Sequence, residues 1–150
     1  MDRLTPIRVR LTEDGAASSL PGAETDPLEQ RLALWAQSKY GDLAAEAIVF
    51  VLLDGAGKLL GYLEHQGGGA TANHNQRELL QAALLANARQ VWVVHNHPSG
   101  NAQPTESDAL WATAFKQLLS YFGIEVRGNV VVTKDQSQEV VPIEFAEVEV

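Results

Sequence analysis

The fold of this 150-residue chain is limited first by two apolar runs that have to be buried. AIVFVLLD (47–54) and QVWVVHNH (90–97) have the composition of strands that lie inside a sheet. LLGYLEHQ (59–66) follows the first run after the turn sequence DGAGK, so we expect these two strands to form a hairpin. A sheet with buried strands is therefore the first element of the predicted fold.

Segments with helical spacing alternate with these strands. We predict helices over 26–41, 76–88 and 104–123, and a fourth strand in IEVRGNVVVT (124–133). PIEFAEVEV (142–150) is predicted to be either a last strand or an acidic tail. The pattern predicts an α/β, or α+β, fold in which helices pack on a mixed sheet.

The N-terminal part of the chain has a different composition. We predict that residues 1–25 form a lead-in and linker, with IRVRL (7–11) as an edge strand, and that residues 26–150 form a single domain. The first helix is expected to start at Asp26 as N-cap, with Glu29 completing a capping box.

Composition and charge exclude several function classes. The chain has no cysteine, which excludes disulfides, thiol nucleophiles and cysteine-ligated zinc, so a metal site has to use histidine and carboxylates. The net charge of -8 disfavours direct DNA binding, because phosphates are neutralised by Lys and Arg. No apolar run is long enough for a bilayer, and the first residues lack the apolar block of a signal peptide. We therefore expect a cytoplasmic protein with no membrane partner.

Two of the four histidines lie close together at the end of the second apolar run. In an extended segment His95 and His97 project to the same side, so their rings can converge on one ion. Asp108 follows after a turn and lies in the first turn of a predicted helix. Two imidazoles and one carboxylate leave the fourth position of a tetrahedral zinc open for water, and zinc lowers the pKa of such a water to about 7.

A structural interpretation of the same residues is also open. TESD (105–108) fits a capping box, with Thr105 as N-cap and Asp108 returning to the backbone. The pattern H-x-H is common in proteins that bind no metal. Spacing alone leaves both a metal site and a purely structural Asp108 open.

The run HNHPSG, followed by Pro104, Thr105 and Asp108, resembles the JAMM (JAB/MPN) metalloprotease motif, which is H-x-H, seven residues, Ser, two residues and Asp. HNHPSG together with GIEV in a late strand is similar to the bacterial RadC branch, as are EAIVFVLLD and RELLQAAL. The similarity covers about residues 44–134. It implies a JAB/MPN-like (cytidine-deaminase-like) mixed sheet flanked by helices.

The resemblance also implies a function. It points to a zinc-dependent hydrolase that cleaves a peptide or isopeptide bond in a protein or peptide substrate. One Zn²⁺ per chain is expected, held by His95, His97 and Asp108. Glu46 matches the general acid/base of the family, and Thr105 at the motif serine position is expected to help hold the oxyanion.

Other residues compete for roles near this site. Glu64, which lies next to His65, is an alternative general base, and Glu78 is a third candidate. A carboxylate at a helix start such as Glu78 also favours the helix dipole, which gives it a structural alternative. Ser99 is a possible neighbour of the metal ligands. We expect His65 to be exposed or at the rim of the site, and His74 to cap the next helix.

The sequence departs from the family pattern at three places. Thr105 replaces the motif serine, and Arg127-Gly128-Asn129 stands where the RadC branch has an Asp-His pair. Residues 1–45 hold one predicted helix where RadC proteins carry a helix-hairpin-helix domain. Two alternative functions therefore remain: a non-catalytic scaffold of the same fold, and a RadC-like role in DNA repair or other DNA transactions, which rests on fold analogy alone.

Overall fold

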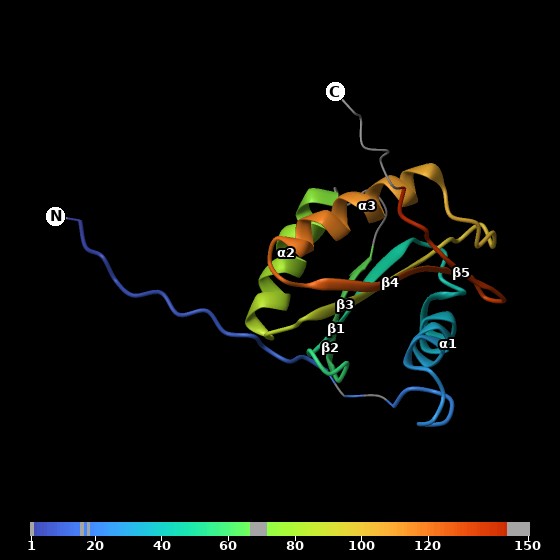
Figure 1. Cartoon of the computed structure of the whole chain (residues 1–150), viewed down its shortest axis with the longest axis horizontal. Coiled ribbons are helices and arrows are strands. Elements are labelled where there is room, and N and C mark those ends of the chain that lie inside the picture. Colours follow the sequence, from blue (N-terminus) through green and yellow to red (C-terminus); the bar gives the residue numbers. More distant parts are fainter. Residues whose placement is uncertain (1, 16, 18, 67–71, 144–150) are drawn as a thin grey trace.

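The computed structural model describes residues 2–15, 17, 19–66 and 72–143, without the side chains of 72–75. The elements are α1 (Leu28–Tyr40), β1 (Ala47–Leu53), β2 (Leu59–Gln66), α2 (Ala72–Leu85), β3 (Gln90–Asn96), α3 (Glu106–Ser120), β4 (Glu125–Val132) and β5 (Ser137–Glu139) (Figure 1). The fold is mixed α+β, as the sequence predicts.

The strands form one mixed sheet in the order β2-β1-β3-β4-β5. β1 is antiparallel to β2 and to β3, which confirms the predicted hairpin, and β5 is antiparallel to β4. β3 and β4 are parallel, and α3 makes the crossover between them. The carboxyl ends of these two strands therefore lie at the same edge of the sheet.

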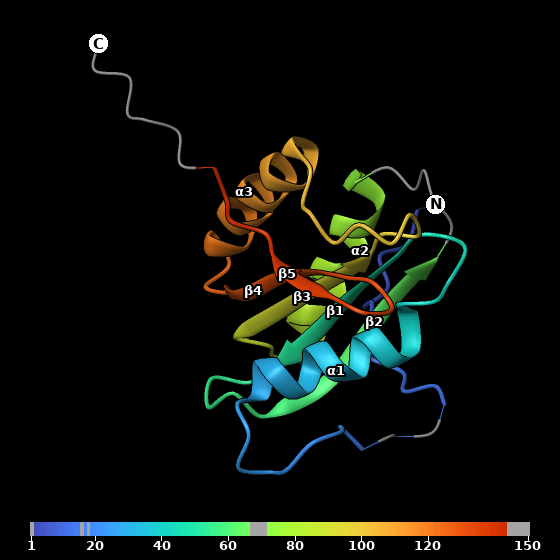
Figure 2. The ribbon, with the colours of Figure 1, turned by 90° about the vertical axis from the view of Figure 1, so that its right-hand side faces the viewer.

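Helices cover both faces of the sheet. α1 packs on one face, and α2 and α3 lie on the other (Figure 2). Side chains of β3 alternate between the two layers: Trp92 and Val94 pack under α1, whereas Val91 and Val93 pack under α2 and α3. The central strands are thus buried on both faces, as their apolar composition predicts.

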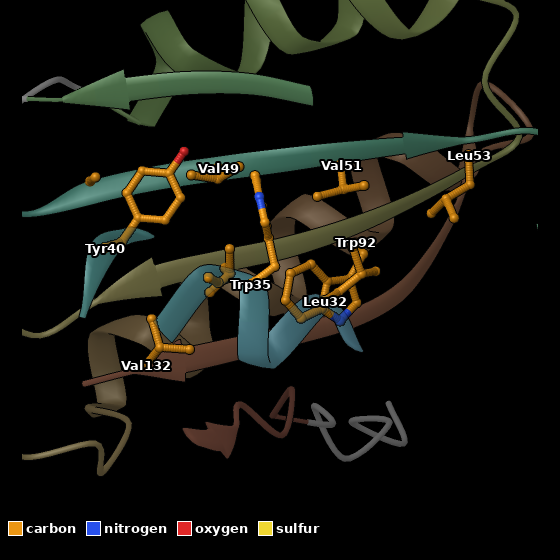
Figure 3. Packing of buried hydrophobic residues seen from close by; sticks show 11 residues of the cluster. Leu32, Trp35, Tyr40, Val49, Val51, Leu53, Trp92 and Val132 are labelled. Carbon is orange, nitrogen blue, oxygen red and sulfur yellow. The ribbon is translucent and has the colours of Figure 1, made fainter. Parts of the chain in front are cut away.

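The face under α1 holds a compact apolar cluster (Figure 3). Leu32, Trp35 and Tyr40 of α1 pack on Val49 of β1 and Trp92 of β3. The rings of Trp35 and Tyr40 meet edge to face with centroids 5.8 Å apart. Full burial of each large apolar side chain contributes roughly 1.5–3 kcal/mol, so this cluster is a major source of stability.

The strand predictions were wrong at two places. Residues 7–11 form no strand, and Ile7 is 88% exposed, because a short alternating run needs a neighbouring edge to pair its backbone groups. β5 was not predicted, since its three residues are all exposed and carry no apolar pattern. In the last segment, residues 142–143 are not in a strand, and the rest of that prediction concerns 144–150, outside the described residues.

The predicted capping box of α1 is also wrong. The N-cap is Pro27, and no side-chain hydrogen bond caps the start of α1. The carboxylate of Asp26 accepts a hydrogen bond from the N–H of Ala23 at 2.9 Å instead. Glu29 forms an ion pair with Arg127 of β4. Both carboxylates therefore have partners other than the orphan N–H groups of the helix start.

The other two helices are displaced from their predicted bounds. α2 both begins and ends before the predicted positions, and Asn87 (φ 56°) ends it in the left-handed conformation. The predicted cap residue His74 lies inside α2, and its side chain is outside the described residues. α3 is shorter than predicted at both ends. None of the helices in the described part of the chain is long and apolar enough to cross a membrane.

Candidate metal centre

The two predicted histidine ligands lie at the carboxyl end of β3, in the middle of the sheet. His95 pairs with Ile48 of β1 and Val131 of β4, and it is 6% exposed. His97 follows the strand, and its backbone N–H donates to the carbonyl of Val132 at 3.1 Å. The two rings converge as the i, i+2 spacing predicts, with their Nε2 atoms 3.2 Å apart.

A backbone carbonyl orients the ring of His97. Its Nδ1 lies 2.9 Å from the carbonyl oxygen of Asn101, so Nδ1–H donates and Nε2 keeps its lone pair. Metal-ligating histidines commonly have such a partner on their second nitrogen. Asn101 acts through its backbone, and for this reason no side-chain motif could have identified it from the sequence.

The turn after His97 returns the chain towards α3. The N–H of Gly100 donates to the carbonyl of His97 at 3.0 Å, and the positive φ of Gly100 (85°) favours glycine at this place. Ser99 is exposed, and its Oγ accepts a hydrogen bond from the N–H of Asn101 at 3.3 Å. Ser99 therefore shapes this loop and lies outside the ligand cluster.

Asp108 combines the two roles that the sequence left open. Thr105 is the N-cap of α3: its Oγ1 accepts a hydrogen bond from the Asp108 N–H at 3.1 Å. In return, the Thr105 N–H donates to Asp108 Oδ2 at 2.9 Å. Asp108 Oδ1 also lies 3.2 Å from Nε2 of His95, and Oδ2 lies 3.2 Å from Nε2 of His97. The capping box thus holds the carboxylate in the orientation that faces both imidazoles.

The surroundings of Asp108 favour its ionised form. Burial raises its pKa, but hydrogen bonds from His95, from the backbone N–H of Thr105 and from the Thr105 side chain lower it by more. Coulombic attraction to His95 acts in the same direction. The net pKa of Asp108 is well below its usual range. Ionised carboxylate is the form that binds a metal.

The three side chains fit one small divalent ion. The two Nε2 atoms are 3.2 Å apart, His95 Nε2 lies 3.2 Å from Asp108 Oδ1, and His97 Nε2 lies 3.2 Å from Asp108 Oδ2. In a tetrahedral site with bonds of about 2.0–2.1 Å, neighbouring ligand atoms lie about 3.3 Å apart. No other group of His, Cys, Asp and Glu in the described ranges is arranged in this way.

Glu46 comes at the edge of the sheet where β3 ends, because β1 and β3 are antiparallel. It precedes β1 and is exposed. Strand alternation puts its side chain on the same face as Ile48, which pairs with His95. The β1–β3 pairing ends at Ile48 and His95, and the same register continued by two residues would set Glu46 opposite His97. A carboxylate at this position would be on the same face of the sheet as His95 and His97, as a general base next to the metal ligands requires.

Glu64, the alternative general base, lies on the opposite face of the sheet. It pairs with Val49, which packs under α1. The Tyr40 hydroxyl donates to Glu64 Oε2, and the Gln66 amide donates to Oε1 at 2.7 Å. Burial and then this hydrogen bond raise the pKa of Tyr40 above its usual range, so the phenol stays a donor. The structure does not bring Glu64 to the cluster.

Glu78 lies on the ligand face but contacts His65. Its Oε2 is 3.5 Å from His65 Nε2. His65 and His95 pair with Ile48 from its two sides, so they are separated by the width of β1. The ring of His65 is half-buried against Phe50, with centroids 6.2 Å apart. Neither Glu78 nor His65 belongs to the ligand triangle.

The segment that departs from the RadC pattern has a structural role. Nε of Arg127 donates to Glu29 of α1, and its guanidinium also donates to Gln90 Oε1 at 3.2 Å. Gly128 lies against Trp92, where a Cβ would come within 2.9 Å of the indole. These residues connect α1 to the sheet and contribute no side chain to the ligand triangle.

Matches to known proteins cover all of the described helices and strands. A family model described as "RadC-like JAB domain" matches residues 28–141. The UPF0758 protein of Aromatoleum aromaticum is 34% identical over 127 residues, which are 83% of this chain and 55% of that protein. A UPF0758 protein of Vibrio cholerae is 31% identical over 98 residues, 65% of this chain and 62% of that protein. The chain thus spans less than two thirds of the length of these relatives.

Proposed function

Because the chain belongs to the RadC-like JAB domain family, we propose that it is a zinc-dependent hydrolase of the JAMM type that cleaves a peptide or isopeptide bond. The observation that carries this proposal is the convergence of His95, His97 and Asp108: the two Nε2 atoms are 3.2 Å apart, and each lies 3.2 Å from a different oxygen of the Asp108 carboxylate. Three protein ligands leave one tetrahedral position open, which is typical of catalytic zinc and not of structural zinc.

The remaining residues have complementary roles in this proposal. Zinc held by His95, His97 and Asp108 would act as a Lewis acid and would lower the pKa of a water molecule to about 7. Glu46 would accept the proton of the attacking water and pass it to the leaving nitrogen. The Thr105 hydroxyl, whose oxygen accepts the Asp108 N–H at the start of α3, would turn its hydrogen from the Asp108 carboxylate to the developing oxyanion.

The first test is the metal content of untagged protein, measured by inductively coupled plasma mass spectrometry after loading with zinc and removal of free zinc. We expect about one zinc per chain in the wild type and none in His97→Ala. Glu64→Gln is the matched control, because it alters a carboxylate on the opposite face of the sheet and should keep the zinc. Absence of zinc from the wild type would favour the non-catalytic scaffold instead.

The second test concerns turnover in a screen of peptide and isopeptide substrates. Glu46→Gln should keep the zinc and lose activity by at least about 100-fold, since general acid–base catalysis contributes roughly 10²–10⁴-fold. Glu64→Gln should retain activity in the same screen. Full activity of Glu46→Gln would contradict the role assigned to Glu46.

A further inference from the structure

Asn96, the residue between the two histidines, is a buried polar side chain that no predicted function used. It is 0% exposed. Strand alternation directs it to the side of the sheet opposite His95 and His97, so it cannot join their ligand triangle. A buried amide needs hydrogen-bond partners, and the position of those partners indicates what the side chain does.

Both partners of Asn96 flank the proposed general base. The Ala47 N–H donates to Asn96 Oδ1 at 2.6 Å, and Asn96 Nδ2 donates to the carbonyl of Ala45 at 3.0 Å. The residue between these two backbone groups is Glu46. One rigid amide group therefore holds the peptide units on both sides of Glu46.

In the described part of the chain, no backbone hydrogen bonds between β1 and β3 hold the segment at Glu46. The pairing of β1 with β3 ends at Ile48 and His95. Beyond it, the N–H of His97 is directed to Val132 of β4. The side chain of Asn96 thus replaces the next backbone hydrogen bonds between β3 and the segment that carries Glu46.

We propose that Asn96 is a positioning residue that fixes Glu46 opposite His97, and so couples the general base to the strand that carries two metal ligands. The inference rests on the proposed function, because it assigns Asn96 an effect through Glu46. A merely structural Asn96 would change stability and leave the behaviour of a ligand at the metal unchanged.

The test uses zinc-loaded protein and acetohydroxamic acid, a zinc-binding probe whose proton a neighbouring carboxylate can accept. The dissociation constant of acetohydroxamic acid is measured by isothermal titration calorimetry. We expect Glu46→Gln to weaken binding at least about 10-fold and Asn96→Ala to weaken it to a similar extent. The double variant should be no weaker than Glu46→Gln alone, because residues that act as a unit are not additive. Zinc stoichiometry should be unchanged in all three variants.

A second measurement needs no metal and reports directly on the hydrogen bonds between Asn96 and the backbone of Ala45 and Ala47. In metal-free protein, the amide hydrogen of Ala47 should exchange at least about 10-fold faster in Asn96→Ala than in the wild type, because its acceptor is gone. If Asn96→Ala does not fold, Asn96→Asp replaces it. Asp keeps an acceptor for Ala47 and loses the donor to Ala45, so an intermediate loss of hydroxamate affinity is expected.

Asn129→Ala is the matched control for truncating a buried asparagine. Asn129 is 5% exposed and lies in β4 opposite Val93, where it has no bond to the Glu46 segment within the described residues. Its substitution should leave hydroxamate affinity unchanged.

Each way of failing has its own signature. A wild type that takes up no zinc overturns the proposed function together with the inference. Binding that is insensitive to Glu46→Gln overturns the role of Glu46, and with it the role of Asn96. Two outcomes would overturn only the positioning role of Asn96, provided that Glu46→Gln weakens hydroxamate binding. In the first, Asn96→Ala binds the hydroxamate like the wild type. In the second, the double variant shows the full effects of both substitutions added together.

Discussion

Each face of the sheet holds a half-buried carboxylate among polar groups. Under α1, Glu64 lies beside the Tyr40 hydroxyl and the Gln66 amide (Figure 3 shows Tyr40). On the other face, Asp108 lies between the Nε2 atoms of His95 and His97. The side-chain exposures are similar, 27% for Glu64 and 19% for Asp108.

The difference lies in what the neighbours of each carboxylate offer. The Tyr40 phenol and the Gln66 amide donate hydrogen bonds to the two oxygens of Glu64. Neither donor atom offers a lone pair towards Glu64, so these groups do not form a metal site with it. Imidazole nitrogens approach Asp108, and each neutral ring has one nitrogen with a lone pair. The carboxylate itself is the same in both places, so its neighbours decide between a structural bond and a ligand set.

The largest effect on stability is expected in the apolar cluster under α1. Trp92→Ala should reduce the free energy of unfolding by about 3–5 kcal/mol, because it leaves a cavity beside Gly128 in the central strands. Denaturant unfolding measures this loss. Zinc stoichiometry under folding conditions should stay at that of the wild type, since the ligands face the other way. A loss below about 1 kcal/mol, or a loss of zinc from folded protein, would contradict this separation of the two faces.

An intermediate effect is expected at Asp108, where ligand and cap coincide. Asp108→Ala should weaken zinc binding by more than about 100-fold, beyond the range for removing an outer-shell partner. It should also destabilise the metal-free protein by about 1 kcal/mol through loss of the cap. Asp108→Asn keeps an oxygen for the Thr105 N–H, so it should retain that stability and still bind zinc weakly. Competition titrations with a chelator measure the affinities, and equal zinc binding by the three proteins would contradict the ligand assignment.

The smallest effect is expected at Tyr40, on the other face. Tyr40→Phe should cost about 1 kcal/mol of stability at neutral pH and leave zinc binding unchanged. Because the folded pKa of Tyr40 is raised, the unfolded chain loses the phenolic proton first, above pH of about 10. Wild-type stability should therefore fall as the pH rises through that range, and the Phe variant should lack this component. Denaturant unfolding at neutral pH and above pH 10 tests both statements, and identical pH profiles would contradict them.

The sequence predicted the convergence of His95, His97 and Asp108 better than it predicted the helix ends. His95, His97 and Asp108 could be found because strand alternation and a helix start place them within reach of one another. The Asp26 capping box failed because local spacing does not show that Arg127, distant in sequence, competes for Glu29. Asn96 was missed because its partners are backbone groups of a neighbouring strand, which carry no sequence signal.

By itself, the sequence determined the strand periodicity, the hairpin, the paired histidines and the capping residues of α3, since each depends on contacts between residues close in the chain. Only the tertiary structure decided that Glu64 is bound by Tyr40 and lies on the face of the sheet opposite the histidines. That choice depends on the register between β1, β2 and β3, because a shift of one residue would move every side chain to the opposite face. Register is set by packing of the whole sheet against α1, α2 and α3, and no single segment of the sequence contains it.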